Sequence, residues 1–356
     1  MNKFEKKLIP NNLEYVPLYC TGFPYKEFLN TYVNFYSIES DNNDKLILYG
    51  KDFSLIKNMG FEAFSLWDFR RKKTTTHASI QNIREYVDEW GRIYKGDWYS
   101  WNGAFSDITI LNSWDRLKLP TQKAMKKLHT FLNSIPKNNS AIVSIPGLFE
   151  KTWQSIGFIK FSKAIRNRDD TLIDEVATFF LDYLKRLTQL LHTNGAFLFL
   201  VADDLGYKNR LFLPKRVWNK YFKQKYKEIV ELIHGIDGRV ILHSDGYISE
   251  MIPTFIDIGF DAVQSLESNA GVDIFSLFRK IGNKICFIGN LDVSTLLTYG
   301  TPREVRNYVS NLLKSASKYD VRLVVSPTQQ LHQQVQIQNV KEMISTVKKW
   351  NTDNGF

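Results

Sequence analysis

The sequence predicts a (β/α)8 TIM barrel, an α/β fold, with an N-terminal extension. Two observations lead to this prediction. Eight short apolar runs end in polar or glycine residues, which is typical of buried parallel strands. Most of these runs are separated by segments with helical signals, and eight alternating strand–helix units indicate a closed barrel. The chain has 356 residues, so a typical barrel of ~250 residues leaves room for an extension and long loops.

The expected strands are short and rich in β-branched and aromatic residues. They cover residues 61–66, 107–111, 141–145, 197–202, 240–242, 262–266, 285–288 and 322–325. Three helices between them are clear from the pattern. One apolar stripe runs through residues 171–191, and a second helix covers about 214–234. A third begins with Thr301, Pro302 and Glu304, which predict a capping box, and ends near residue 318.

The sequence pattern also predicts that the chain has three parts. Residues 1–57 mix aromatic, amide and charged residues without a clean period, so we expect an extension packed over one end of the barrel. The apolar run 46–49 is a candidate strand within it. The barrel itself is expected over residues 58–350, and residues 351–356 are expected to be frayed.

Composition narrows the class of protein. Lys and Arg exceed Asp and Glu by 47 to 37, but the excess is spread out, so a solvated basic surface is favoured over nucleic-acid binding. Two cysteines without framework spacing fit a reducing cytoplasm. The N-terminal residues have no apolar signal core, and no apolar run approaches the ~18 residues of a membrane span. We therefore expect a cytoplasmic protein that binds neither nucleic acid nor membrane.

Polar residues follow most of the expected strands, where barrels place their active sites. The candidates are Asp68, Asp203, Asp204, His243, Asp245, Gln264, Glu267, Asn290, Asp292, Ser326 and Gln329. A lone aspartate after a strand is often the N-cap of the next helix, and this alternative stays open for Asp68 and Asp292.

Two groups in this set are the expected catalytic residues. Asp203 and Asp204 are adjacent carboxylates, and close burial of such a pair raises one pKa, which suits proton transfer. His243 and Asp245 are two residues apart on an extended segment, so their side chains point the same way. They are candidates for a metal site or an acid–base pair. The alternative for His243 is a hydrogen-bonded histidine at a strand end.

The segment after residue 202 reads L-G-Y-K-N-R and offers Tyr207, Lys208 and Arg210. These side chains are candidates for binding a carboxylate or phosphate group of a substrate. A solvated loop face is the alternative.

The residues quoted so far also carry a resemblance. Six stretches of the sequence resemble the uroporphyrinogen decarboxylase superfamily, and they fall in order along the chain. They are residues 60–69, 203–212, 240–246, 258–273, 289–292 with the following G-T-P-R-E-V, and 326–340. This superfamily includes the corrinoid- and coenzyme-M-type methyltransferases. The resemblance implies a TIM barrel and makes a homodimer an expectation.

Departures from the family patterns bear on the activity. The arginine motif R-Q-A-G-R of the true decarboxylases is absent. The methyltransferase branch holds zinc with an H-x-C pair and a later cysteine, but here Asp245 follows His243 and the later segment reads S-P-T-Q-Q. A zinc site with thiolate ligands is therefore not expected. A site with nitrogen and oxygen ligands stays open, with His243, Asp245 and Glu267 as candidate ligands of a divalent metal such as zinc. The cobalamin signature D-x-H-x-x-G is missing, so a corrinoid is expected only on a partner protein.

Three functions remain after this comparison. The leading hypothesis is methyl transfer between a small methylated substrate and a corrinoid protein. It assigns catalysis to Asp203, Asp204, His243 and Asp245, and substrate binding to Asp68, Tyr207, Lys208, Gln264, Glu267, Asn290 and Gln329. The second is a cofactor-independent decarboxylase of a tetrapyrrole or smaller acid. The third is a barrel that binds a small molecule without turning it over.

Overall fold

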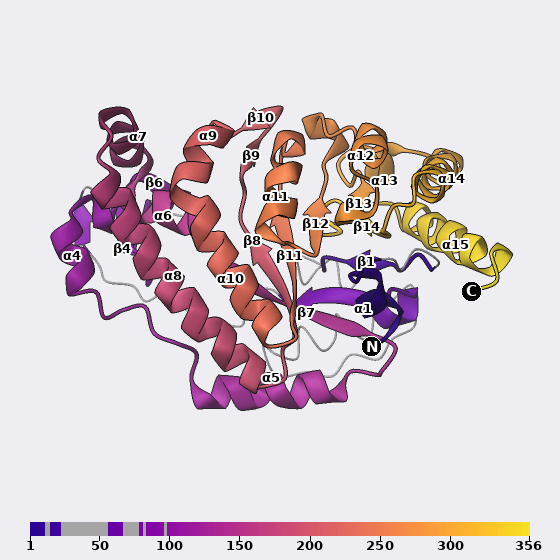
Figure 1. Cartoon of the computed structure of the whole chain (residues 1–356), viewed down its shortest axis with the longest axis horizontal. Helices are drawn as coiled ribbons and strands as arrows, with labels where there is room; N and C mark the ends of the chain where they lie inside the picture. Colours follow the sequence, from indigo (N-terminus) through magenta and orange to yellow (C-terminus); the bar gives the residue numbers. More distant parts are fainter. Residues whose placement is uncertain (11–14, 23–55, 67–77, 81–82, 96–97) are drawn as a thin grey trace.

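Eight parallel strands form the centre of the computed structural model (Figure 1). The structure describes residues 1–356 except 11–14, 23–55, 67–77, 81–82 and 96–97. The strands in spatial order are β1 Tyr19–Cys20, β2 Ala63–Leu66, β7 Ser140–Pro146, β8 Leu198–Ala202, β11 Arg239–Ser244, β12 Ala262–Ser265, β13 Cys286–Leu291 and β14 Leu323–Pro327. A parallel bridge between Leu18 and Val325 joins the last strand to the first. The sheet therefore closes, and the predicted (β/α)8 barrel is confirmed.

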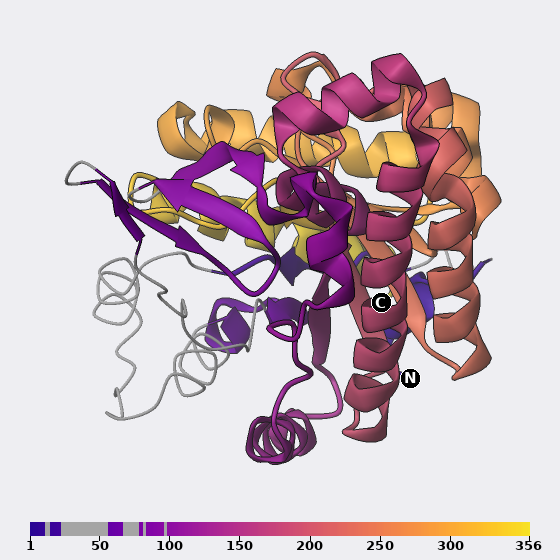
Figure 2. The ribbon, with the colours of Figure 1, turned by 90° about the vertical axis from the view of Figure 1, so that its left-hand side faces the viewer.

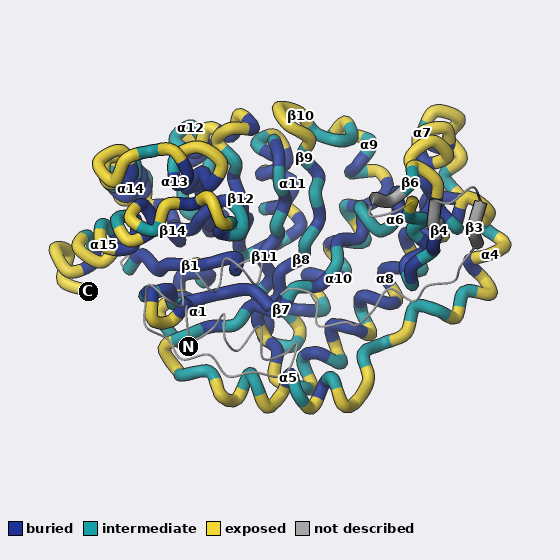
Figure 3. Tube along the Cα trace, turned by 180° about the vertical axis from the view of Figure 1, so that it is seen from behind, coloured by how far each residue is buried: buried dark blue, intermediate teal, exposed yellow. Residues whose placement is uncertain are grey.

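Helices surround this sheet, with buried strands inside and exposed helix surfaces outside (Figure 3). They are α4 Ile108–Asn112, α5 Gln122–Ser134, α6 Leu148–Ile156, α7 Phe158–Asn167, α8 Asp170–Thr193, α9 Lys215–Trp218, α10 Gln224–Gly235, α11 Ile252–Ile258, α12 Ile274–Ile281, α13 Leu296–Tyr299, α14 Pro302–Lys318 and α15 Ile337–Asp353. The capping box expected at the start of α14 is present, because Thr301 and Glu304 each accept the other's backbone N–H. No helix among the described residues is long and apolar enough to cross a membrane.

Seven of the eight expected strands are found, and one prediction is wrong. The apolar run 107–111 forms helix α4 instead, with the Asp107 side chain accepting the N–H of Thr109 at its N-terminus. Most of this helix faces solvent and only Leu111 is buried, so its apolar residues do not form a strand of the core. The missing barrel strand is β1, which comes from the segment expected to be an extension. The candidate strand 46–49 lies outside the described residues.

An antiparallel sheet that the sequence analysis did not predict lies between β2 and β7 in the chain. Its strands are β3 Ala78–Ile80, β4 Ile83–Val87, β5 Arg92–Lys95 and β6 Trp98–Gly103, in that order. Figure 2 shows it projecting from one side of the barrel. It packs on α6 and α7, where the backbone of Gly103 meets that of Ser155 and Gly157 so closely that a Cβ would clash. This sheet thus fixes the helix that follows β7.

The lower half of the barrel interior is apolar and filled. Leu200, Ile241 and Val324 point inward from their strands. Phe4, within α1 Lys3–Lys7, and Leu8, the C-cap residue of this turn of helix, join the same buried cluster. The next inward positions are polar, among them His243 and Gln264. The chemistry of the barrel is therefore concentrated toward the carboxyl ends of the strands.

The C-terminal helix is anchored to the N-terminal segment. Asn351 is buried, accepts the N–H of Val16 at 3.0 Å and donates to its carbonyl at 2.9 Å. Helix α15 continues to Asp353, so the expected frayed tail 351–356 begins inside a helix.

Candidate active site at the carboxyl ends of the barrel strands

Asp203 and Asp204 follow β8 and point to opposite sides of the strand. Asp203 is fully buried against the helical layer, where it accepts the N–H groups of Phe149 at 3.0 Å and Glu150 at 2.8 Å. The hydroxyl of Tyr226 donates to the same carboxylate. Asp203 therefore caps the N-terminus of α6 and faces this helix, whereas the triad described below lies on the other side of the strand end. The prediction that Asp203 is catalytic stays a prediction.

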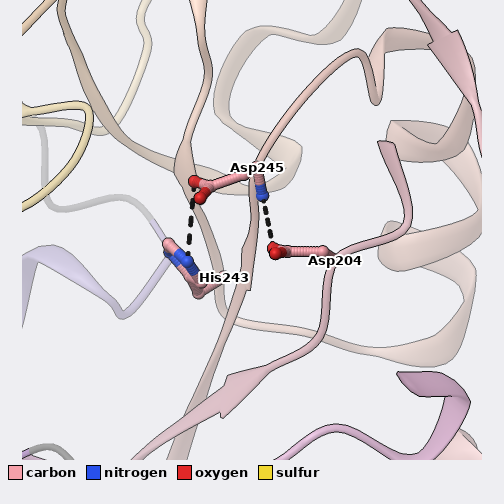
Figure 4. A group of neighbouring side chains, drawn as sticks. All are labelled: Asp204, His243 and Asp245. Atoms are coloured by element: carbon pink, nitrogen blue, oxygen red, sulfur yellow. Dashed lines mark hydrogen bonds and ion pairs between the residues drawn. The ribbon is translucent and has the colours of Figure 1, made fainter. Parts of the chain in front are cut away.

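Asp204 points toward the end of β11. Its Oδ1 accepts the backbone N–H of Asp245 at 2.9 Å, and its side chain lies beside those of His243 and Asp245 (Figure 4). The three residues each offer one ligand atom, and these atoms all lie within 4.8 Å of one another. We call this group, Asp204, His243 and Asp245, the triad. The structure thus brings together three of the four predicted catalytic residues.

His243 is held on both nitrogens. Its Nδ1 faces Oε1 of Gln264, the residue paired with it on β12. Its Nε2 lies 3.6 Å from Oδ1 of Asp245. The imidazole therefore has one nitrogen directed at a neutral amide and the other at the carboxylates of the triad.

Asp245 belongs to a wider polar network. Its Oδ1 accepts the hydroxyl of Ser265 at 3.0 Å, and its Oδ2 accepts Nε2 of Gln329 at 3.2 Å. The same Gln329 nitrogen donates to Oε1 of Glu267 at 2.7 Å, so one amide bridges two carboxylates. Glu267 also accepts the N–H of Gly246 at 2.7 Å. The predicted residues Glu267 and Gln329 thus lie next to the triad.

Glu150 is a member of the site that the sequence analysis missed. It lies in the first turn of α6 and accepts Nε2 of Gln154 at 2.9 Å. Arg92 of β5 donates to the other end of the Gln154 amide at 3.3 Å. The available signal was its place five residues after the apolar run 141–145, shortly after the carboxyl end of a barrel strand.

The pKa values of these groups reflect burial and crowding of like charges. Burial raises the pKa of Glu150 to about 8, with the Asp204 carboxylate as the next cause. Burial, followed by the charge of Asp245, also raises the pKa of Asp204 and of Glu267. For His243, burial disfavours the cation, but the carboxylates of Asp245 and Asp204 outweigh it and raise the pKa. The site therefore favours bound protons or a bound cation.

Comparison with known proteins assigns the chain to a family. Residues 155–350, more than half of the chain, match the family model described as uroporphyrinogen decarboxylase (URO-D). The chain belongs to the URO-D family. No match was found among curated proteins.

Two solved structures share the fold of this URO-D-family chain. A methyltransferase from Methanosarcina mazei has a TM-score of 0.68 and 15% sequence identity, over 97% of this chain and 96% of the other. A B12-independent methionine synthase from Shewanella sp. W3-18-1 has a TM-score of 0.53 and 12% identity, over 95% and 97% of the two chains. At these identities the likeness concerns the barrel fold alone.

The remaining predicted residues of this URO-D-family barrel lie in different surroundings. Asn290 is buried and bonded to the carbonyl of Leu266 and the hydroxyl of Tyr308 on α14, so it faces the helical layer. Tyr207 and Lys208 are exposed on the hairpin of β9 Gly206–Tyr207 and β10 Arg210–Leu211. Asp68 lies outside the described residues. Asp292 accepts the N–H of Ser294 at 2.7 Å in the turn before α13, but the N-cap residue of that helix is Thr295.

The triad fits a divalent metal ion by its donor chemistry. It offers one imidazole nitrogen and two carboxylate oxygens, and zinc in catalytic sites takes three such protein ligands and keeps a fourth position open. Both cysteines of the chain are buried, and Cys286 belongs to the apolar lower layer of the barrel. The donor set is therefore nitrogen and oxygen, without a thiolate.

Proposed function

We propose that this protein is a methyltransferase that moves a methyl group between a small methylated substrate and a separate corrinoid protein. The observation that carries the proposal is the triad, three potential metal ligands within 4.8 Å of one another in a URO-D-family barrel. The fold of the Methanosarcina mazei methyltransferase supports the same class of reaction.

His243, Asp204 and Asp245 would hold the ion, and an ion bound there would polarise the heteroatom of the substrate. In the transfer, the bond between the methyl carbon and the heteroatom breaks as the methyl group passes to the cob(I)alamin-type nucleophile of the partner. The electron pair stays on the heteroatom, which then takes up a proton. Glu150 is suited to supply this proton, because burial raises its pKa to about 8.

Around the triad, further side chains set its charge and orientation. Gln329 holds Asp245 and Glu267 together through one amide nitrogen. The described residues at this end of the barrel bring four carboxylates together, those of Glu150, Asp204, Asp245 and Glu267. This acidic surrounding favours a cation or a neutral substrate over a polycarboxylate such as a porphyrinogen.

A decarboxylase of a small acid is the second candidate, and one observation favours it. Burial raises the pKa of Glu150 to about 8, which favours the protonated carboxyl group that a decarboxylase needs to protonate the carbanion left after loss of CO2.

Two measurements test the proposal together. Metal content is determined in protein purified without chelator, beside the His243→Gln variant. Transfer to cob(I)alamin is then measured from a panel of methoxy, methylthio and methylamine compounds. We expect about one divalent ion per chain, lost in the variant, and methyl transfer that depends on it. Carbon dioxide release from small acids without methyl transfer would favour the second candidate, and the absence of both reactions and of metal would refute the metal-dependent mechanism.

A further inference from the structure

Gln264 occupies a buried position directly beside His243. The two residues are register partners on the neighbouring parallel strands β12 and β11. Gln264 is fully buried, and its side chain reaches the imidazole on one side and the backbone of Thr328 after β14 on the other. Three strands of the barrel therefore meet at this amide.

The orientation of the amide follows from its partner just after β14. A backbone carbonyl only accepts hydrogen bonds, so the group that faces the carbonyl of Thr328, at 3.1 Å, is the NH2 of Gln264. The Oε1 atom then faces Nδ1 of His243. Because an amide oxygen also only accepts, the hydrogen of a neutral His243 must lie on Nδ1.

The opposite nitrogen is the one that faces the carboxylates. Nε2 of His243 lies 3.6 Å from Asp245 and belongs to the triad. Without an acceptor at Nδ1, the neutral ring would gain from placing its hydrogen on Nε2, where Asp245 accepts it. That tautomer has no lone pair on the nitrogen that faces the triad, so it cannot bind an ion there.

We infer that Gln264 is a positioning residue. Its amide donates to the Thr328 carbonyl and accepts from Nδ1 of His243, and it thereby fixes the imidazole so that the Nε2 lone pair is presented to the triad. The tautomer is a property of the metal-free protein, whereas its use for binding an ion rests on the proposed function. The prediction that Gln264 binds substrate stays a prediction, because each end of its amide makes one of these contacts and can make one more.

The first experiment uses metal-free protein and does not depend on activity. Long-range 15N–1H correlation spectra of uniformly labelled protein, kept in chelator and recorded along a pH series that reaches the neutral form of His243, report which nitrogen of each neutral histidine carries the hydrogen. The chain has six histidines, and the His243→Gln variant assigns the signal. We expect the Nδ1–H tautomer for wild-type His243, and the Nε2–H tautomer or a mixture in Gln264→Met.

Two further variants separate positioning from packing. Gln264→Glu keeps an acceptor toward Nδ1 and is expected to retain the wild-type tautomer. Gln336→Met is the matched control, since Gln336 also donates its amide to a backbone carbonyl, that of Thr298 at 2.9 Å. It should leave the His243 signal unchanged. Circular dichroism and thermal unfolding confirm that each variant is folded.

The second experiment measures zinc affinity by competition with a chromogenic chelator. Loss of a partner that orients a metal-bound histidine typically weakens binding by about 10–100-fold, and this is the expected effect of Gln264→Met, with Gln264→Glu closer to wild type. An Nε2–H tautomer in the wild type, or an unchanged tautomer in Gln264→Met, would overturn the inference. Absence of zinc binding with the expected tautomer would instead count against the proposed function alone.

Discussion

Asp203 and Asp204 are neighbours in the chain, yet they lie in two different regions of the molecule. Asp203 faces the helical layer, where two backbone N–H groups at the start of α6 and the Tyr226 hydroxyl donate to it. Asp204 faces the triad, where one backbone N–H donates to it and the Asp245 carboxylate repels it. A change of one position at a strand end thus separates a carboxylate that caps α6 from one that lies in the triad.

The comparison shows that the role of a buried carboxylate depends on the hydrogen-bond donors and charges around it. Burial raises the pKa of Asp203 to about 6 against the effect of its three donors, but those donors are fixed and satisfied. The triad has an excess of acceptors over donors, so its carboxylates gain from a proton or a metal ion. Variants of the two regions should therefore affect different properties.

The largest expected effect concerns the triad. His243→Gln should lower kcat/KM for methyl transfer by about 10²–10⁴-fold, because it removes a ligand and a potential acid–base group. Asp203→Asn should keep kcat/KM within about threefold of wild type at a temperature where it is folded, because its side chain does not contact the triad. Steady-state kinetics of the metal-loaded proteins check this. An equal loss in both variants would contradict the separation of the two regions.

The next effect is the pH dependence of stability in metal-free protein. Folded Glu150 has a pKa of about 8, whereas an unfolded glutamate titrates near pH 4.3. Between these values the folded state binds more protons than the unfolded state, so the free energy of unfolding falls as pH rises from about 4.5 to 8. The free energy of unfolding of the Glu150→Gln variant should fall less over this range. Urea unfolding at pH 5, 6.5 and 8 measures the slope.

The control for this slope is Glu175→Gln, which removes an exposed carboxylate on α8. It should keep the wild-type slope. If the unfolding free energy of Glu150→Gln changed with pH as steeply as that of the control, Glu150 would be ionised over the whole pH range tested.

A smaller effect distinguishes the two aspartates by stability. Asp203→Asn should lower the free energy of unfolding by about 1–3 kcal/mol, because a donor at the start of α6 or the Tyr226 hydroxyl loses its acceptor. Asp204→Asn keeps an acceptor for the Asp245 N–H and removes a charge beside a like charge, so its stability should equal or exceed wild type. Urea unfolding with chelator present tests both variants, and a greater loss in Asp204→Asn would reverse the assignment.

The smallest effect concerns the Tyr226 hydroxyl alone. Tyr226→Phe removes the donor to Asp203 and the acceptor for the Leu148 N–H, which should lower stability by about 1 kcal/mol. Zinc affinity should not change. Tyr207→Phe, at a side chain that is 50% exposed, is the matched control and should be neutral within error. Altered zinc affinity in Tyr226→Phe would show that the two regions are coupled.

Most of the barrel could be predicted from local sequence because its strands are buried on both faces and read as apolar runs. The run 107–111 was misread since an apolar run of five residues does not distinguish a strand from a turn of helix. Strand β1 has two residues, too few for any periodic signal, and only pairing with β2 and the bridge to Val325 makes it part of the barrel. The sheet β3–β6 depends on cross-strand pairing, which sequence spacing does not reveal.

The candidate site was predictable in part for the same reason. Strand ends place Asp204, His243, Asp245 and Glu267 at one edge of the sheet, and the structure brings these residues together. Glu150 was missed because it reaches the site from the first turn of a helix. The side chain of Asn290, a predicted substrate-binding residue, bonds to Tyr308 of the helical layer, and the sequence does not indicate this contact.

The sequence by itself determined the α/β class, seven strands of the barrel and the edge where the acidic residues gather, since apolar periodicity and strand ends are local properties. The tertiary structure decided which of Asp203 and Asp204 faces the triad and which atom of Gln264 faces His243. Both depend on partners distant in the chain: the start of α6 and Tyr226 for Asp203, and the Thr328 carbonyl for Gln264. Hydrogen-bond direction is set by the group that the folded chain places opposite, and no local pattern records it.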